Sequence, residues 1–389
     1  MSLPEELKDN LCLMPWLHLY IGTDGKANAC CNAPITYGSV RNETVKNIWE
    51  GEKINAFRAQ LLKGDKDRRC AICYNKEAAG KSSIRTETLA KFKEHIPKIL
   101  AGEQLTKPVY LDIRFSNVCN LRCRTCWHGA SSSWFEDAKA LKTNFGDKAI
   151  IKATTNNSKL IHETIAYSDE LEEVYFAGGE PLLMEEHYEL LDEIIAKKSF
   201  STRIRYNTNL SKLKLKDKSA IAYWKQLKNV HLSISIDDKE ERVEVIRKGM
   251  KWKALMENMK TIQKECPHVV IEIAPTISVF NIFTVSELHR YFYETKLIPS
   301  INSIYINLLE RPNYYNIQIL PKEEKEKAKL MLENHIEWLK NSEAKTALIN
   351  EFEAIINYLF LKNDTKGLSQ FRKQTERLNT LRNDSISTF

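Results

Sequence analysis

The sequence predicts an α/β protein built around a parallel sheet. Six short runs rich in β-branched and aromatic residues lie between residues 109 and 308, and amphipathic stretches such as PLLMEEHYELLDEIIAKK (181–198) separate them. Repeated βα units of this kind form either an open doubly wound sheet or an incomplete barrel. In both architectures ligands gather at the carboxyl ends of the strands, so we expect functional residues there.

Composition sets limits on the class of protein. The chain has 389 residues, of which 43% are hydrophobic and 28% charged, as in an ordinary soluble globular protein of two or three domains. The first ten residues, MSLPEELKDN, are acidic and lack the apolar stretch of a secretory signal, so we expect a cytoplasmic protein with no membrane span. A net charge of +7 permits an anionic partner without demanding one. Nine cysteines without a signal favour metal binding over disulfides.

The expected first domain, residues 1–105, consists of short elements. Turn signals such as TDG at 23–25 and KGDKD at 63–67 punctuate it. Helices are expected at about 43–63 and 83–100.

The expected second domain, residues 106–310, holds the alternating elements. The predicted strands are 109–115, 172–177, 202–208, 229–236, 268–279 and 303–308.

The expected third part, residues 311–389, is a helical extension. Helical periodicity runs through 321–341 and 343–362, and a basic stretch follows at 366–382. The apolar stripes of these helices predict that they cover the open end or side of the barrel.

Three cysteines follow the first predicted strand of the second domain. Cys119, Cys123 and Cys126 have the spacing C-x3-C-x2-C, which lets a tight loop point three thiolates at one site. Three thiolates on a four-iron cube leave one iron open for a non-protein ligand, whereas fully ligated clusters take four. The alternatives are unrelated buried cysteines or a structural zinc site, for which His128 is the nearest candidate fourth ligand.

With this loop in this place, the chain resembles the radical S-adenosylmethionine (SAM) superfamily over about residues 106–310. The resemblance implies a partial (β/α)6 TIM-like barrel, a [4Fe–4S] cluster on the three cysteines, and bound SAM. It also implies SAM contacts from the residue after the third cysteine, from segments that end the later strands, and from IRKG at 246–249. These are Trp127 near the adenine; Gly178, Gly179 and Glu180 of GGEP at the methionyl amine; Asn209 near the cofactor; Ser235 and Asp237 at the ribose; and Arg247 at the methionyl carboxylate.

The resemblance further implies the chemistry. The reduced cluster would cleave SAM to methionine and a 5′-deoxyadenosyl radical, which abstracts a substrate hydrogen. The electron would come from an external one-electron donor such as flavodoxin or ferredoxin. No side chain need act as a general base in that step, because the cofactor carries the difficult chemistry.

A second set of cysteines precedes the radical SAM-like region. Cys12 and Cys30 flank a predicted hairpin whose turn is Asp24-Gly25, and Cys70 and Cys73 form a C-x2-C pair. This pattern resembles the twitch module, a shortened relative of the SPASM domain that holds an auxiliary [4Fe–4S] cluster. The familiar order places that module after the radical domain, and here it comes first.

Four thiolates could ligate the auxiliary cluster fully, which favours electron transfer over substrate binding. Cys31 could replace Cys30 as a ligand or be a small buried hydrophobe. The same spacing also permits a zinc site with four cysteine ligands. Cys266 stands alone and is expected to be structural.

These features predict a radical SAM enzyme that oxidises or modifies a peptide or a small molecule. The first alternative is an RNA-modifying radical SAM enzyme, suggested by SKLKLKDK at 211–218 and the basic C-terminal stretch. The second is a non-catalytic, zinc-stabilised binding protein.

Overall fold

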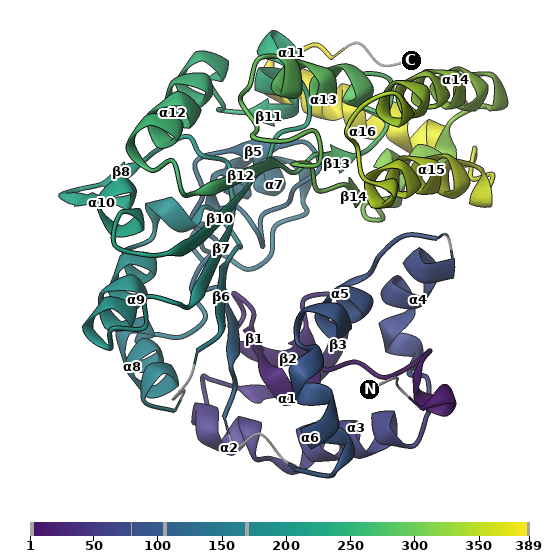
Figure 1. Cartoon of the computed structure of the whole chain (residues 1–389). Coiled ribbons are helices and arrows are strands. Elements are labelled where there is room, and N and C mark those ends of the chain that lie inside the picture. Colours follow the sequence, from purple (N-terminus) through teal and green to yellow (C-terminus); the bar gives the residue numbers. More distant parts are fainter. Residues whose placement is uncertain (1–3, 79, 104–106, 168–170, 387–389) are drawn as a thin grey trace.

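The computed structural model describes residues 4–78, 80–103, 107–167 and 171–386. A single eight-stranded sheet runs through the molecule in the order β12-β10-β7-β6-β4-β1-β2-β3 (Figure 1). The five consecutive strands from one edge of this sheet, β12, β10, β7, β6 and β4, are mutually parallel. The predicted α/β class with a parallel sheet is therefore confirmed, and the C-terminal region is helical as expected.

The core elements alternate as the sequence predicted. They are β4 (Tyr110–Ile113), β5 (Arg122–Cys123), η4 (Ser132–Trp134), α7 (Phe135–Leu141), α8 (Asn157–Tyr167), β6 (Glu173–Phe176), η5 (Pro181–Leu183), α9 (Glu185–Ala196), β7 (Arg203–Thr208), β8 (Lys214–Leu215), β9 (Lys218–Ser219), α10 (Ala220–Trp224), β10 (Asn229–Ile234), α11 (Glu240–Ile246), β11 (Arg247–Lys248), α12 (Trp252–Glu265), β12 (Val270–Ile273), β13 (Thr276–Ile277), α13 (Val285–Glu294) and β14 (Asn307–Leu308).

The last two predicted strands are shorter than expected. The run 268–279 breaks into β12 and β13, with Pro275 between them, because proline has no N–H to donate to a sheet ladder. The run 303–308 gives only β14, which pairs with β13 in a separate two-stranded sheet.

The N-terminal elements join the same sheet as the core. They are η1 (Glu5–Leu7), α1 (Met14–Leu17), β1 (His18–Ile21), β2 (Lys26–Cys30), β3 (Ala33–Ser39), α2 (Val45–Trp49), α3 (Glu52–Leu62), η2 (Arg68–Cys70), α4 (Ala71–Ala78), α5 (Ile84–Lys91), η3 (Lys93–His95) and α6 (Ile96–Leu100). Strand β1 pairs in parallel with β4, and β2 and β3 continue antiparallel beyond it. The N-terminal region is thus a lateral extension of the barrel sheet.

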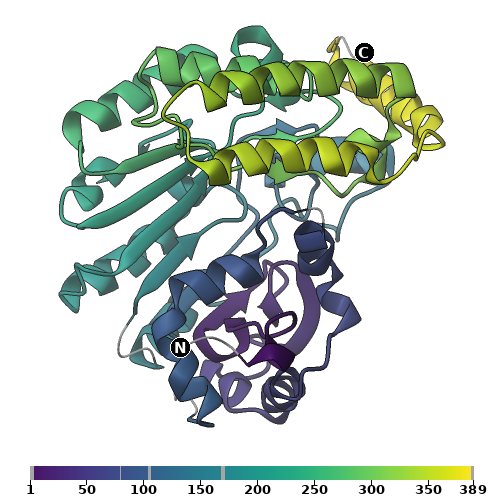
Figure 2. The same ribbon diagram turned by 45° about the vertical axis from the view of Figure 1, so that its right-hand side comes forward.

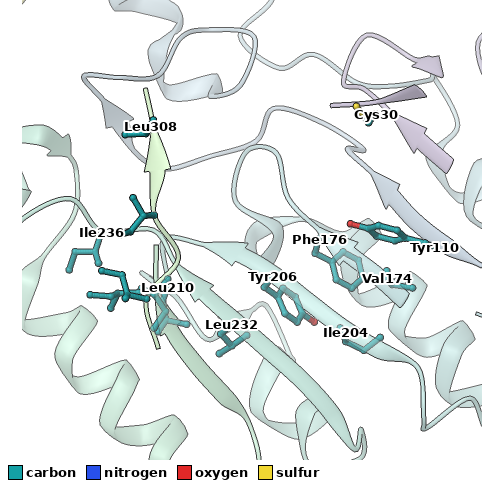
Figure 3. Packing of buried hydrophobic residues seen from close by; sticks show 14 of the residues in the cluster. Cys30, Tyr110, Val174, Phe176, Ile204, Tyr206, Leu210, Leu232, Ile236 and Leu308 are labelled. Atoms are coloured by element: carbon teal, nitrogen blue, oxygen red, sulfur yellow. The ribbon is translucent and has the colours of Figure 1, made fainter. Parts of the chain in front are cut away.

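Alternation along the strands separates an apolar face from a polar one. Val174, Phe176, Ile204, Tyr206 and Leu232 are buried (Figure 3), and Phe176 and Tyr206 contact aromatic side chains of α9 and α10. The alternating positions on the opposite face carry charged side chains, including Asp112, Arg114, Glu173, Arg205 and Glu272. The concave side of the sheet is therefore polar, while the helices cover the apolar side.

The C-terminal helices lie across the open side of the sheet. They are η6 (Asn313–Tyr315), η7 (Ile317–Ile319), α14 (Lys322–Lys340), α15 (Thr346–Leu361) and α16 (Gly367–Arg382). Figure 2 shows the N-terminal region below these helices. Lys81 and Ser82, just before α5, both contact the carboxylate of Glu351 on α15. Hence the N-terminal region touches the sheet at β4 and the helical extension at α15. Within the described ranges, none of the helices has the length together with the apolar composition of a transmembrane span.

Four buried histidines are expected to make the fold sensitive to acid. Burial lowers the pKa of His18 and His289 to about 4 and that of His187 and His335 to about 3. Below the unfolded pKa of about 6.5, the unfolded chain binds protons that the folded chain refuses, so stability falls as pH falls. Each histidine should cost about 2 kcal/mol between pH 7 and pH 5.

The replacement His187→Leu tests this expectation. The His187 side chain forms a hydrogen bond between its Nε2 and the Tyr206 hydroxyl at 2.8 Å. The variant should lose part of the dependence of the unfolding free energy on pH, corresponding to one proton, when urea denaturation is compared from pH 7 to pH 5. An unchanged slope would show that the histidine does not titrate as its burial implies.

Candidate functional site

The three-cysteine loop lies directly after β4, at the carboxyl end of the sheet. Cys123 sits in β5, which pairs antiparallel with β11 so that Arg247 is opposite Cys123. The N–H of Cys126 donates to the carbonyl of Cys123 at 3.0 Å, which turns the loop back on itself. Cys119, Cys123 and Cys126 are free cysteines of intermediate exposure, and burial acts on their thiol groups. The short β5·β11 pairing therefore brings a distant arginine to the loop.

Donors surround the sulfurs of this loop. The Leu121 N–H and the Asn209 side-chain amide donate to Cys119 Sγ at 3.5 and 3.9 Å. Arg247 Nη1 donates to Cys123 Sγ at 3.8 Å. Donors and a cation near sulfur stabilise the thiolate, which is the form that binds metals. Asn209 and Arg247, two residues expected at the cofactor, thus lie beside the predicted cluster ligands.

Burial opposes free thiolates in this loop. It raises the pKa of Cys119 and Cys126 to about 12 and also raises that of Cys123, against the lowering effect of Arg247. Without a bound cation these groups stay protonated at neutral pH, since an unpaired buried anion is costly. Binding of a cluster must therefore release protons from the loop.

His128 does not complete a zinc site with these cysteines. It is buried, its Nδ1 accepts from the Phe145 N–H at 3.0 Å, and its Nε2 donates to the Ala149 carbonyl at 3.1 Å. Both ring nitrogens are therefore engaged in the neutral imidazole, and neither has a free lone pair for a metal. His128 is therefore not available as the fourth zinc ligand, which favours a cluster with one open iron.

The GGEP segment ends β6 against the cysteine loop. Gly178 and Gly179 have φ values of +80° and +58°, and a Cβ on Gly179 would lie 2.3 Å from the Val118 carbonyl oxygen. Only glycine fits this close backbone approach. The Glu180 N–H donates to the same Val118 oxygen at 2.7 Å. The segment is thus fixed to the residue that precedes Cys119.

The Glu180 carboxylate is buried and accepts three hydrogen bonds. Its donors are the Leu182 N–H at 3.1 Å, the Thr208 hydroxyl at 2.6 Å and the Asn209 N–H at 2.6 Å. Burial raises its pKa to about 7, although these hydrogen bonds favour the charged form. A carboxylate has about four lone-pair positions, so one acceptor position remains for a ligand amine.

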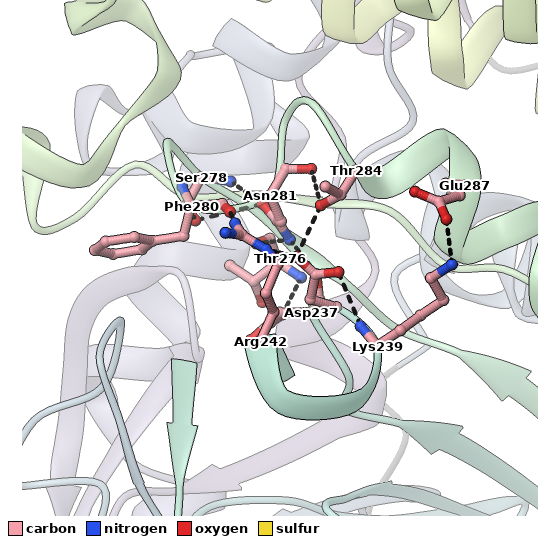
Figure 4. Close-up of polar contacts among 10 residues, drawn as sticks. Asp237, Lys239, Arg242, Thr276, Ser278, Phe280, Asn281, Thr284 and Glu287 are labelled. Atoms are coloured by element: carbon pink, nitrogen blue, oxygen red, sulfur yellow. Dashed lines mark hydrogen bonds and ion pairs between the residues drawn. The ribbon is translucent and has the colours of Figure 1, made fainter. Parts of the chain in front are cut away.

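Asp237 and Arg247 form an ion pair at the end of β10. Asp237 Oδ2 lies 2.8 Å from Arg247 Nε, and Asp237 Oδ1 accepts from the Thr276 N–H at 2.9 Å. Asn281 donates to the Asp237 carbonyl at 3.0 Å, within a polar network that continues through Asp238, Arg242 and Thr284 (Figure 4). The Asp237 carboxylate thus orients the arginine. Its expected contact with a ribose stays a prediction, as does that of the half-buried Ser235.

Trp127 stands at a cavity beside the loop. The indole is 53% exposed and packs edge-on against Phe145 at 5.4 Å between ring centroids. The cavity measures about 460 Å³ and brings together the cysteine loop, the segment after β14 and α16; its aromatic walls are Trp127, Trp134, Tyr314 and Tyr315. Aromatic walls suit a planar ligand such as a nucleobase. Nothing in the spacing of the sequence identified Tyr314 and Tyr315 as part of one wall.

Four of the N-terminal cysteines face one cavity. Cys12, Cys30, Cys70 and Cys73 line it, from three separate segments. The predicted hairpin is present, with Tyr20 opposite Asn28 and Gly25 at φ +78° in the turn. Cys31 does not line the cavity; it is exposed, and its thiol donates to Asn32 Oδ1 at 3.7 Å. The geometry thus favours Cys30 over Cys31 as the ligand.

Arg85 holds two of these segments together. Its Nη1 donates to the carbonyls of Lys8 and Leu11 at 3.0 and 3.1 Å, directly before Cys12. Its Nε donates at 3.0 Å to Glu77 on α4, the helix that carries Cys73. This buried arginine could not be identified from the sequence, because it lies in no cysteine motif.

The cysteine sets are not closed around zinc. Among the described residues, the one group of three His, Cys, Asp or Glu ligand atoms within 4.8 Å of one another is Glu94, His95 and Glu172, at the surface. A tetrahedral zinc site with bonds of 2.3 Å needs sulfurs about 3.8 Å apart. Among the described residues, neither cysteine set meets this spacing, so neither is arranged as a closed zinc site.

Replacing either Cys30 or Cys31 by serine distinguishes which of the two residues ligates the auxiliary cluster. Cys30→Ser should remove the auxiliary cluster, because it takes away one of four ligands, whereas Cys31→Ser should leave it intact. Iron per chain after anaerobic reconstitution measures the difference. Loss of iron from the Cys31 variant alone would reverse the assignment.

Two family models match the chain. The radical SAM superfamily model matches residues 113–278, and the SPASM iron–sulfur cluster-binding domain matches residues 12–74. The chain therefore contains a region that matches the radical SAM superfamily, and a region that matches an iron–sulfur cluster-binding domain of the SPASM type precedes it. The cofactors of these domains are a radical SAM [4Fe–4S] cluster, SAM and an auxiliary cluster. No curated protein matches the chain.

Several solved structures are similar. Native anSMEcpe with bound AdoMet and Cp18Cys peptide is 17% identical, with 61% of this chain and 60% of that chain covered and a TM-score of 0.40. Streptococcus suis SuiB bound to S-adenosylmethionine is 16% identical, with 77% and 63% covered and a TM-score of 0.41. TYW1 with a lysine-pyruvate adduct is 13% identical, with 58% and 71% covered and a TM-score of 0.33. This chain thus spans less than two thirds of the length of anSMEcpe and SuiB.

Proposed function

We propose that the protein is an enzyme that reductively cleaves SAM and abstracts a hydrogen atom from a peptide or small-molecule substrate. One observation carries the proposal. The cysteine loop after β4, the GGEP turn after β6, Asn209 after β7 and Arg247 at the start of β11 meet at one edge of the sheet. Ligand sites of α/β sheets form at this carboxyl edge.

Each residue has a role in this proposal. Cys119, Cys123 and Cys126 would hold the cluster and leave one iron open to SAM. Bound together, cluster and SAM supply a 5′-deoxyadenosyl radical to the substrate. Arg247 would bind the methionyl carboxylate, oriented by its ion pair with Asp237.

The remaining contacts follow the same edge. Glu180 would accept a hydrogen bond from the methionyl amine through its remaining lone pair, beside the backbone of Gly178 and Gly179. Ser235 would approach the ribose, and Trp127 would border the adenine at the aromatic cavity.

Cys12, Cys30, Cys70 and Cys73 would hold the auxiliary cluster. With four protein ligands it has no open iron, so we assign it to electron transfer during oxidation of the substrate rather than to substrate binding.

The RNA alternative finds less support. Lys216 and Lys218, from the basic run 211–218, pair with Glu185 and Asp192. These pairs reduce the positive charge available to phosphates. The zinc-scaffold alternative lacks a fourth ligand at the loop, since His128 is engaged on both nitrogens.

The test is formation of 5′-deoxyadenosine and methionine from SAM by the anaerobically reconstituted protein under a strong one-electron reductant. The proposal expects both products, and only when the reductant is present. A fully reconstituted protein that forms neither product would refute it.

A further inference from the structure

Helix α16, the last helix of the described residues, contacts the three-cysteine loop. Arg124, between Cys123 and Cys126, donates from Nη2 to Asn379 Oδ1 of α16 at 2.6 Å. Asp384, just after the helix, pairs with Lys248 of β11. Thus α16 (yellow in Figure 2) and the residues just after it contact Arg124, which directly follows β5, and Lys248 of β11.

Arg382, in the last turn of α16, is linked through the Trp134 side chain to the backbone of Cys123, one of the predicted cluster ligands. Its guanidinium lies 4.5 Å from the ring centroid of Trp134, and the indole N–H of Trp134 donates to the Cys123 carbonyl at 2.9 Å. Its Nε also donates at 2.8 Å to Asp137, whose other oxygen accepts from Arg122 at 2.8 Å. Arg382 and Asp137 are 7% and 4% exposed, so the contact between them is buried, whereas the Arg122 side chain is 33% exposed.

Positive charge exceeds negative charge in this region. Two carboxylates, Asp137 and Asp384, face four cations: Arg122, Arg124, Lys248 and Arg382. Nη1 and Nη2 of Arg382 and Nε and Nη1 of Arg124 are buried without a hydrogen-bond partner among the described residues. Buried charge of one sign is costly unless an opposite charge lies nearby.

A bound cluster would supply that opposite charge. Three thiolates outweigh the two positive charges of an oxidised four-iron cube, so the assembly is anionic, and it becomes more so on reduction. Nearby fixed cations stabilise the more negative state and so favour reduction.

Resting on the proposed cluster site, we propose that Arg382 is a positioning residue for the three-cysteine loop, and that its positive charge favours the reduced form of the cluster bound there. The C-terminal helix thereby makes an otherwise difficult one-electron reduction easier. The residue does not touch the predicted SAM contacts, so it acts through Trp134, Asp137 and the local field.

The test compares Arg382→Met, which keeps length and packing without charge, with Arg382→Lys, which keeps charge. Arg377→Met is the matched control, because Arg377 is exposed on the same helix. The full chain is reconstituted, and reduction of each cluster is followed by EPR-monitored redox titration. In Arg382→Met the ratio of reduced to oxidised cluster at the three-cysteine loop should fall about tenfold at fixed poise, a shift of about 59 mV for a one-electron couple.

Arg382→Lys should keep the potential within a few-fold of wild type, and Arg377→Met and the auxiliary cluster should not move. Hydrogen exchange of residues 119–127 should rise in Arg382→Met, because the loop loses its support. Equal potentials in wild type and Arg382→Met, or equal losses in the Met and Lys variants, would overturn the role of charge. If Arg382→Met fails to assemble the cluster, assembly by Arg382→Lys supports the proposal and its failure there overturns it.

Failure of the inference about Arg382 can be distinguished from failure of the proposed function. If wild type binds no cluster on Cys119, Cys123 and Cys126, the function fails before any Arg382 variant is compared.

Discussion

Replacing Cys119, Cys123 and Cys126 together by alanine is expected to abolish formation of 5′-deoxyadenosine from SAM. The three thiols share one loop, and their removal leaves no ligand set for a cluster with an open iron. The fall should reach the detection limit rather than a fraction of wild type, because electron delivery to SAM has no other route. Product is measured after anaerobic reconstitution with excess reductant.

Cys266→Ala is the matched control for that experiment. Cys266 is fully buried and its thiol contacts the Ile221 carbonyl at 3.8 Å, away from both cysteine sets. This variant should cost a modest amount of stability, about 1 kcal/mol, and keep its activity. Activity in the triple variant, or its loss in the Cys266 variant, would contradict the assignment of the loop.

The second large effect is expected from Arg247→Met. Arg247 is 8% exposed and lies between Asp237 and the Cys123 thiol, where it can bind a carboxylate. Loss of a charge-assisted contact of this kind costs about 1.5–3 kcal/mol, which corresponds to a rise in the SAM dissociation constant of roughly 10- to 150-fold. Equilibrium dialysis of SAM against reconstituted protein measures it.

Arg242→Met separates a specific role from a general loss of charge. Arg242 makes the same kind of Nε-to-carboxylate pair, with Asp238 at 2.7 Å, but its Nη2 donates to the Phe280 carbonyl instead of a thiol. The variant should bind SAM within a few-fold of wild type. Equal weakening in the two variants would mean that Arg247 supports the local fold and does not bind the ligand.

The sequence predicted those parts of the site that lie within short motifs. The loop of Cys119, Cys123 and Cys126 and the Gly25 turn both depend on local spacing. GGEP could be placed at a strand end for the same reason. The close approach of Gly179 to the Val118 carbonyl requires glycine. The glycines themselves are visible in the motif without any three-dimensional information.

Long-range partners could not be predicted. The pairing of Arg247 with Asp237, the parallel pairing of β1 with β4 and the clamp of Arg382 on Asp137 join residues from separate elements. No periodicity records such contacts. The choice between Cys30 and Cys31 is of the same kind, because it depends on which side chain faces the cavity between three segments.

One prediction of local structure was also too simple. The β-rich run 268–279 was expected to form one strand, but it divides at Pro275. The proline was visible in the sequence, and its missing N–H should have shortened the predicted strand. Its consequence is functional, because β13 then supplies the Thr276 N–H that binds Asp237.

Iron and acid-labile sulfide per chain test the account most directly. They are measured after anaerobic reconstitution of wild type, of the Cys119/Cys123/Cys126→Ala variant and of the Cys12/Cys30/Cys70/Cys73→Ala variant. Two separate four-iron clusters predict about eight irons in wild type and about four in each variant. About four irons in wild type and none in the Cys119/Cys123/Cys126 variant, with zinc bound by the N-terminal cysteines, would contradict the auxiliary cluster and leave that module structural.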